Sequence, residues 1–291
     1  MFGRRSTNSL NAQSSKAGQP RVRMLAARAT GRGTSKDAVG AYWGAAGAAL
    51  GALVALVLFA PAAWLARGVH SASSGQIVLA DARGTVWNGS SRFIFTGGAA
   101  SRDATELPQG IAWTVRPALS GLSTHISAPC CTSAPLAATI TPRLTGADAA
   151  LTVPLMRMGA AVLAGLGTPW NTIAPQGQLQ LQGQALTLAW REGRLRMGGS
   201  ATMDLTDMSS RLSTLAPLGD YRLTLLGGDA PTLTLETLKG GLELSGAGQW
   251  VGARLRFNGE ASAAPERLDA LSNLLNIIGR RNGPRSVITL G

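Results

Sequence analysis

The sequence has few of the side chains on which catalysis and metal binding depend. Its 291 residues include only two histidines and two cysteines, and charged residues make up 14%. A structural zinc site takes four Cys or His ligands at a defined spacing, which His70, His125, Cys130 and Cys131 do not offer. Neither a Gly-x-Ser-x-Gly nucleophile motif nor a phosphate-binding glycine loop with its lysine is present. We therefore expect a protein that is not an enzyme.

Aromatic residues are also scarce, at 5%, whereas glycine is abundant, with 37 residues. Glycine at this density does not suit a helical bundle, and a chain that is 45% hydrophobic is too apolar to be disordered overall. Leucine and threonine runs broken by glycine are typical of many short strands. The composition predicts a mainly β fold.

The net charge of +12 is unevenly distributed along the chain. Residues 1–40 hold eight lysines or arginines and one acid, whereas residues 67–291 hold 19 basic and 14 acidic side chains. Nucleic-acid-binding proteins usually carry a basic face with aromatic or helical readout elements, and no such pattern is seen here. We expect no nucleic-acid partner. Residues 1–40, which lack an apolar period, are expected to form a disordered cytoplasmic tail.

A long apolar segment follows the basic tail directly. Between residues 41 and 66 the only ionisable side chain is that of Tyr42. A bilayer-spanning helix needs about 20 apolar residues, so this segment predicts a transmembrane helix over residues 41–66. Because basic residues precede the helix, the positive-inside rule puts the N-terminus in the cytoplasm and residues 76–291 in the periplasm. We expect a single-pass protein of a bacterial inner membrane.

A cleaved signal peptide is the alternative interpretation of this segment. A basic region, an apolar stretch and Ala60-Pro61-Ala62 partly fit that pattern. The apolar stretch, however, exceeds the roughly 7–15 residues of an ordinary signal core, and Pro61 lies within the cleavage tripeptide. A retained anchor is the favoured prediction.

Small residues in the same segment raise the question of self-association. Gly40-x3-Gly44 and Gly47-x3-Gly51 have the spacing that lets two membrane helices approach closely. A homodimer through this helix is one interpretation, and an Ala/Gly-rich helix that faces only lipid is the other.

The domain expected over residues 76–291 consists mostly of antiparallel hairpins. It begins with a strand, a turn at Asn88-Gly89 that suits the positive φ angles of a tight hairpin, and a returning strand. From Gly177 onward leucines alternate with polar residues in successive runs. The phase slips near Gly183, as is typical of a bulge, a bend or two separate strands. These runs predict an antiparallel sheet with one apolar and one polar face.

Two helices are expected to interrupt the strands. Residues 154–166 begin with proline and end before Gly167, and residues 265–278 place leucines on one face behind Pro265. Residues 286–290 predict a final strand. The expected fold class is thus mainly β, with an N-terminal transmembrane helix followed by a curved antiparallel β-sheet domain that has two or so short covering helices.

The adjacent residues Cys130 and Cys131 are the only thiols. In an oxidising compartment they could form a vicinal disulfide, bridge to a partner, or stay free. The sequence leaves these alternatives open.

Several motifs, taken in order, resemble the type II secretion system protein N family over residues 45–291. The first is Gly84-Thr-Val-Trp-Asn-Gly89 behind the apolar segment, and Ile111-Ala-Trp-Thr-Val-Arg-Pro117 follows it. Leu218-Gly-Asp-Tyr221 and the Thr237–Trp250 stretch resemble the late hairpins of the family. The resemblance assigns structural roles to Gly84, Thr85, Trp87, Gly89, Trp113, Tyr221, Gly246, Gly248 and Trp250.

The resemblance implies an accessory component of the protein-export apparatus, without enzymatic activity or cofactor. Its expected partners are other type II secretion subunits, either of the inner-membrane platform or the secretin. The long basic tail and the adjacent cysteines depart from the family pattern. As an alternative, a curved sheet similar to the AsmA-like envelope proteins would bind or shield lipid in a groove. An open trough lined by Leu223, Leu233 and Leu244 would favour that alternative, and an apolar face sealed by helices would favour protein contacts.

Overall fold

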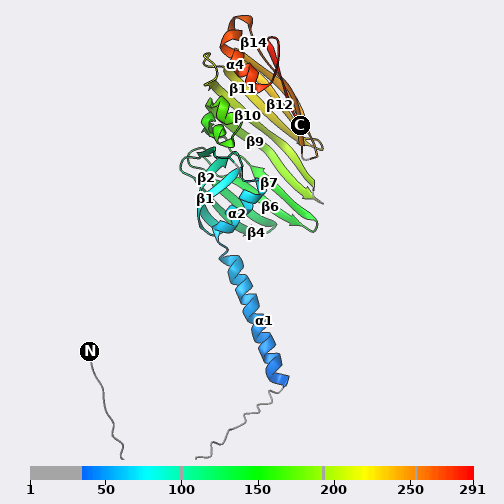
Figure 1. Ribbon diagram of the computed structural model, residues 1–291. Helices are drawn as coiled ribbons and strands as arrows, with labels where there is room; N and C mark the ends of the chain where they lie inside the picture. The colour runs from blue at the N-terminus through cyan, green and yellow to red at the C-terminus, as the bar shows by residue number, and fades with distance from the viewer. Residues whose placement is uncertain (1–34, 99–100, 192–193, 253) are drawn as a thin grey trace, which may run out of the picture. The chain divides into compact units, whose positions relative to one another are not determined.

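The structure is a computed structural model that describes residues 35–98, 101–191, 194–252 and 254–291. It divides into two compact units, Met1–Gly51 and Ala52–Gly291. Residues 1–34 of the predicted tail lie outside the described residues. The described part of the second unit is mainly β, as the composition predicts, with one antiparallel sheet and a few short helices (Figure 1).

Within the described residues the sheet has 16 strands. They are β1 (Ile77–Gly84), β2 (Asn88–Thr96), β3 (Ala104–Glu106), β4 (Ile111–Ala118), β5 (Gly121–Ser127), β6 (Leu136–Arg143), β7 (Gly146–Thr152), β8 (Met156–Gly159), β9 (Pro175–Arg191), β10 (Arg194–Ser210), β11 (Gly219–Gly228), β12 (Thr232–Gly240), β13 (Leu242–Val251), β14 (Arg254–Ala263), β15 (Arg280–Asn282) and β16 (Arg285–Leu290).

The strands follow one another across the sheet almost in chain order. The path runs β1-β2-β4-β5-β6-β7-β9-β10-β11-β12-β13-β14-β16-β15, and the short strands β3 and β8 pair with β2 and β9 beside it. Every pairing is antiparallel, since short connections join most neighbours. The sequence-based prediction of an antiparallel meander is therefore confirmed.

The helices are α1 (Ser35–Leu58), α2 (Ala62–Ala72), the 3-10 turns η1 (Ala160–Leu166) and η2 (Pro265–Arg267), α3 (Trp170–Ile173) and α4 (Leu268–Ile278). The η1, α3 and α4 segments lie along one edge of the sheet, at the left and top in Figure 1. The leucines of α4 are its buried face, since Leu271, Leu274 and Leu275 are at most 2% exposed. The helix predicted over residues 265–278 is confirmed, with a 3-10 first turn.

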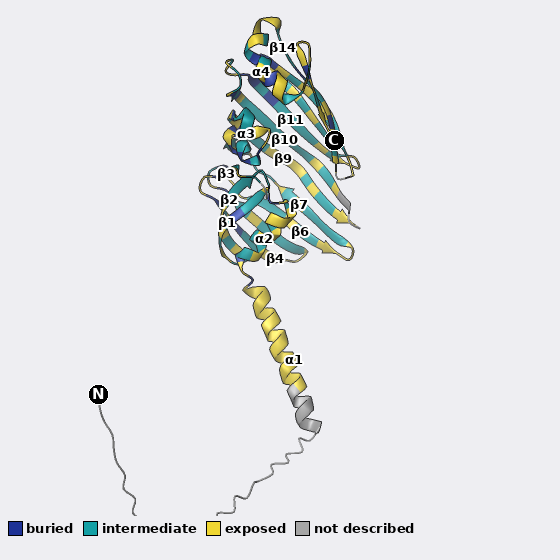
Figure 2. Cartoon of the chain, viewed as in Figure 1, coloured by how far each residue is buried: buried dark blue, intermediate teal, exposed yellow. Residues whose placement is uncertain are grey.

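The main core sits where these helices meet the sheet. Leu179, Tyr221 and Leu242 from the strands pack in one cluster with Ala160 of η1 and Leu271 of α4. At this edge alternate strand residues face the helices, and burying them removes apolar surface from water. The rest of the same sheet face carries mostly half-buried residues, drawn in teal in Figure 2.

The helix predicted over residues 154–166 is wrong in its first half. Met156–Gly159 form strand β8, which pairs with β9 from Met156 opposite Leu181 to Gly159 opposite Gln178. Only the second half is helical, as the 3-10 turn η1. The apolar residues Met156 and Met158 are two positions apart, a spacing that puts both on one face of a strand but not on one face of a helix.

The apolar segment between residues 41 and 66 does not form one continuous helix. The chain breaks between Leu58 and Ala62, where Pro61 adopts extended backbone and forms a bridge with Thr85. Proline lacks the N–H that a continuing helix needs, so the helix ends before it. Within the described part of the chain, no helix is long and apolar enough to span a bilayer.

Two local predictions have different outcomes. The tight turn predicted at Asn88-Gly89 is wrong, because both residues already belong to β2 and Thr85–Trp87 form the connection. The phase slip predicted near Gly183 is confirmed. The pairing of β9 with β10 shifts there between Gly198 and Ser200, and Ala185 has a positive φ of 48°.

Candidate functional site

The connection between β1 and β2 is the most elaborate polar arrangement among the motif residues. The Thr85 N–H donates to the Asn88 carbonyl at 2.8 Å, and the Asn88 N–H donates to Thr85 Oγ1 at 3.1 Å. Gly84 closes the turn with a φ of +84°, which favours glycine because a β-carbon is strained there. The Gly-Thr-x-Trp-x-Gly motif therefore encodes one closed turn.

Trp113 holds this turn from the neighbouring strand. Trp113 is only 4% exposed, and its Nε1–H donates to the carbonyls of Thr85 and Val86 at 3.2 and 3.1 Å. Gly89 pairs with Trp113, and a β-carbon at Gly89 would collide with the indole ring. The structure thus brings Gly84, Thr85, Gly89 and Trp113 together.

The same turn receives the chain where it enters the sheet domain. Trp87 Nε1 donates to the Val57 carbonyl at 2.7 Å, and the Val86 N–H donates to the Ala60 carbonyl at 2.9 Å. The last carbonyls of a helix have no partner within the helix, so Trp87 satisfies one of them. We name residues 84–89 the entry turn, because they fix the segment between α1 and α2.

The late motifs lie elsewhere in the sheet and do not join the entry turn. Tyr221 is 3% exposed in the main core, and its hydroxyl donates to the Leu242 carbonyl at 3.1 Å. Burial, with a smaller effect of nearby Asp220, raises the pKa of Tyr221 above its ordinary value, so the phenol stays neutral. This side chain ties β11 to the start of β13.

Gly246 and Gly248 make room for one aromatic residue. Phe257 pairs with Gly248, and a β-carbon at Gly246 would overlap the Phe257 ring. Phe257 is 5% exposed, and its ring lies over Gly246 and Gly259, whereas Gly248 lies against its Cα and Cβ. Trp250 lies further along β13, opposite Leu255, and belongs to neither group.

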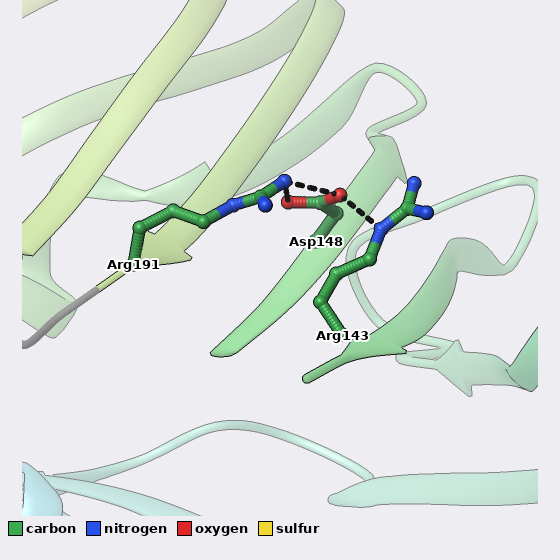
Figure 3. A network of polar contacts seen from close by, with 3 residues as sticks. All are labelled: Arg143, Asp148 and Arg191. Atoms are coloured by element: carbon green, nitrogen blue, oxygen red, sulfur yellow. Dashed lines mark hydrogen bonds and ion pairs between the residues drawn. The ribbon is translucent and has the colours of Figure 1, made fainter. Parts of the chain in front are cut away.

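A cluster of charges that the motifs do not include joins three strands. Asp148 of β7 accepts from Arg143 Nε at 2.9 Å and from Arg191 Nη2 at 2.7 and 2.8 Å (Figure 3). The hydrogen bond from Arg143, and then that from Arg191, lowers the pKa of Asp148 below its ordinary value. Arg143 and Asp148 belong to one hairpin, whereas Arg191 is 43 residues beyond Asp148 and is brought to it by the register of β7 and β9.

The two cysteines form a vicinal disulfide. Cys131 is buried with Leu107 and Ala128 in a small second core, and its carbonyl accepts from the Arg157 N–H at 2.8 Å. The loop therefore packs as part of the fold. Among the described residues, no group of three or more His, Cys, Asp or Glu side chains is placed to hold a metal ion.

The fold and these contacts define an antiparallel β-sheet domain, in which polar side chains hold backbone segments in place. The sequence model of the family described as "Type II secretion system (T2SS), protein N" matches residues 75–288. The chain belongs to this family. Neither a curated protein nor a solved structure matches the chain.

The match covers the described sheet from just before β1 almost to the end of β16. Membership of this family supports an accessory role in protein secretion. It also implies interaction with other subunits of the secretion system.

Proposed function

We propose that the protein is a non-enzymatic accessory subunit of the type II secretion apparatus, which acts through protein contacts in the periplasm. The observation that carries this proposal is the family match over residues 75–288, which spans nearly the whole sheet. The polar contacts of the motif residues support a scaffold, because each joins one backbone segment to another.

The proposal includes a tether at the inner membrane. Residues 42–59 of the chain are apolar and solvent-exposed, with Tyr42, Trp43 and Phe59 at 79%, 76% and 74% exposure. Exposed apolar surface of this kind favours contact with lipid or with another apolar surface. The basic residues ahead of this segment favour a cytoplasmic N-terminus and a periplasmic sheet domain.

The edge strand β16 offers a contact for a partner subunit. Residues Ile288, Thr289 and Leu290 pair with β14 on one side, while β15 covers only the first half of β16. Within the described chain no strand covers their other side, so backbone groups are left to pair with a strand from another subunit.

A photo-crosslinking amino acid at Thr289 of the tagged full chain tests this contact in intact cells. Thr289 pairs with Asn258 of the neighbouring strand, which supplies the matched control position. We expect mass spectrometry to identify a platform subunit or the secretin at position 289, in larger amounts than at 258. Recovery of no secretion subunit from either position would overturn the proposal.

A lipid-shielding groove is the second candidate function. Leu223 and Leu233 lie on the same sheet face, half-buried and outside the helix-covered core, whereas Leu244 packs against that core. The helix-covered core thus includes Tyr221 of β11 and is contacted by Leu235 of β12, whereas Leu223 and Leu233 lie outside it. Stoichiometric phospholipid or lipopolysaccharide in the purified protein, with no secretion subunit, would favour this second candidate.

A further inference from the structure

The hairpin connections of the sheet gather at one rim. The β4–β5, β6–β7, β9–β10, β11–β12 and β13–β14 connections all lie at the ends of strands that run away from the covering helices (Figure 1). This arrangement follows from the antiparallel order, since every second strand reverses at the same side. We call this edge the tip rim.

Two neighbouring hairpins carry a leucine at their tips. Leu119 follows β4 and Leu144 follows β6, and their exposures of 112% and 107% exceed that of a reference extended residue. Because β5 and β6 are adjacent, the two tips stand about 10 Å apart, two strand spacings. Glycine, asparagine, aspartate and serine usually occupy such positions, so neither leucine is there for turn geometry.

A third apolar side chain and a set of arginines lie beside these leucines. Trp190 at the end of β9 is 51% exposed and pairs with Ala147 of β7. We define the tip surface as Arg116, Leu119, Arg143, Leu144, Trp190 and Arg191. A single exposed leucine needs no explanation. Strand register puts Arg116, Arg143 and Arg191 on one face of the sheet and Trp190 on the other. A surface that meets the rim end-on would therefore contact both faces, and to such a surface the rim is both apolar and basic.

Asp148 holds two of these arginines side by side without using all their donors. Each guanidinium has five N–H groups, and the pair with Asp148 uses Nε of Arg143 and Nη2 of Arg191 (Figure 3). The terminal nitrogens of Arg143 take no part in this pair. An open hollow of ≈ 670 Å³ lies here, lined by Pro142, Arg143, Leu144, Thr145 and Arg191. Guanidinium donors at such a hollow suit phosphate oxygens.

The chain enters the sheet domain close to this rim. The entry turn binds the backbone of Val57 and Ala60, and the Trp87 carbonyl accepts from the Val115 N–H at 2.7 Å. Val115 lies four residues before Leu119, so the entry point and the tip are about 13 Å apart along β4. The apolar segment that precedes Ala60 therefore ends at the side of the sheet where the leucines project.

We propose that the tip surface docks onto an anionic phospholipid leaflet, with Leu119, Leu144 and Trp190 entering the headgroup–acyl boundary and the arginines binding lipid phosphates. Interfacial membrane contacts combine an apolar insertion with electrostatic attraction to anionic lipid in this way, and tryptophan prefers the headgroup level. The inference rests in part on the proposed tether of residues 42–59, and it adds a second membrane contact made by the sheet domain itself.

The test uses the full chain reconstituted into vesicles of phosphatidylglycerol and phosphatidylcholine. Single cysteines at Leu119 or Leu144 are labelled with an environment-sensitive fluorophore, since both native cysteines are held in the disulfide. A label at Leu50 reports on the tether, and one at the exposed Asn282, the last residue of β15, reports on a surface expected to stay in water. Quenching by acyl-brominated lipid measures the depth of each label.

We expect bromolipid to quench the labels at 119 and 144 about twofold, with little quenching at 282. Replacing Arg116 by Glu, or removing the phosphatidylglycerol, should reduce the quenching at both tips and leave that at position 50 unchanged. If bromolipid quenches the label at 50 but quenches the labels at 119 and 144 no more than the label at 282, the docking proposal alone is overturned. If bromolipid does not quench the label at 50, the proposed tether is overturned instead.

A protein partner for the same surface is a separate outcome. If the tip labels leave water only when another secretion subunit is added, and bromolipid does not quench them, the lipid proposal is overturned in favour of an acidic protein surface.

Discussion

Gly89 lies opposite Trp113 in the sheet, and a β-carbon on Gly89 would stand 2.5 Å from Cζ2 of the indole ring. The same β-carbon would lie 2.6 Å from the carbonyl oxygen of Arg83. The glycine is therefore a requirement of the buried ring, and the ring in turn holds the entry turn through its Nε1–H.

Replacing Gly89 by Ala should destabilise the fold by about 1–3 kcal/mol, because backbone and ring cannot both give way. Thermal unfolding of the full chain in mild detergent measures the loss. Gly159→Ala is the matched control, since a β-carbon there meets no atom within 4 Å. Equal melting temperatures for both variants would show that the ring has room to move.

Trp87→Phe should loosen the chain between α1 and α2. The substitution keeps an aromatic ring but removes the donor to the Val57 carbonyl, a loss of about 1 kcal/mol. Amide hydrogen exchange at Val86, whose N–H donates to Ala60, should become about fivefold faster. Trp250→Phe, on a strand outside the entry turn, should leave this exchange unchanged; equal acceleration in both variants would contradict a local effect.

Tyr221→Phe should cost about 1 kcal/mol at neutral pH, because the buried Leu242 carbonyl loses its donor. Burial raises the pKa of Tyr221 in the folded chain above the usual value near 10. The stability that the neutral phenol contributes is present below that usual value and is lost as pH rises through the folded pKa. Urea unfolding at pH 8 and pH 11 should show a smaller difference between wild type and variant at the higher pH. A constant difference would contradict this linkage.

Thr237→Val should destabilise the junction of β12 with β13. The backbone pairing of these strands extends only from Thr232 to Leu235, and beyond it the Thr237 hydroxyl donates to the Leu244 carbonyl and accepts from its N–H. Valine has the same shape without the hydroxyl, so two backbone groups lose a partner at a cost of about 1–3 kcal/mol. Thr234→Val is the control, because its hydroxyl makes one exposed contact at 3.5 Å. Chemical unfolding compares the two.

The alternation of leucines with polar residues predicted many of the strands, and a proline followed by leucines on one face predicted α4. Leucines at every second position identified the strands from Gly177 onward, and Pro265 with the leucines behind it identified α4. These signals are local, since each depends on the side chains of one segment. The family motifs also marked residues that the structure brings into contact, such as Gly89 with Trp113.

Pairing between distant segments determined what the sequence did not predict. Met156–Gly159 is a strand because β9 offers it a partner, and the break before Pro61 is fixed by Thr85 of the entry turn. Asn88-Gly89 suits a tight turn, but the Thr85 hydroxyl and the positive φ of Gly84 close the chain earlier. The cluster of Arg143, Asp148 and Arg191 depends on strand register, which has no local signal.

The segments η1 and α4 pack against one end of the long strands β9 and β10, where Leu179 and Met208 join the main core. Toward the other end, at the β9–β10 hairpin, these strands are held mainly by pairing with their neighbours in the sheet. Opening should cost least at the hairpin tips and most beside α4, which would give a gradient of hydrogen-exchange protection along each strand. We therefore expect the hairpin ends of the strands to bend to fit an uneven surface, while the ends packed against the helices keep the fold intact.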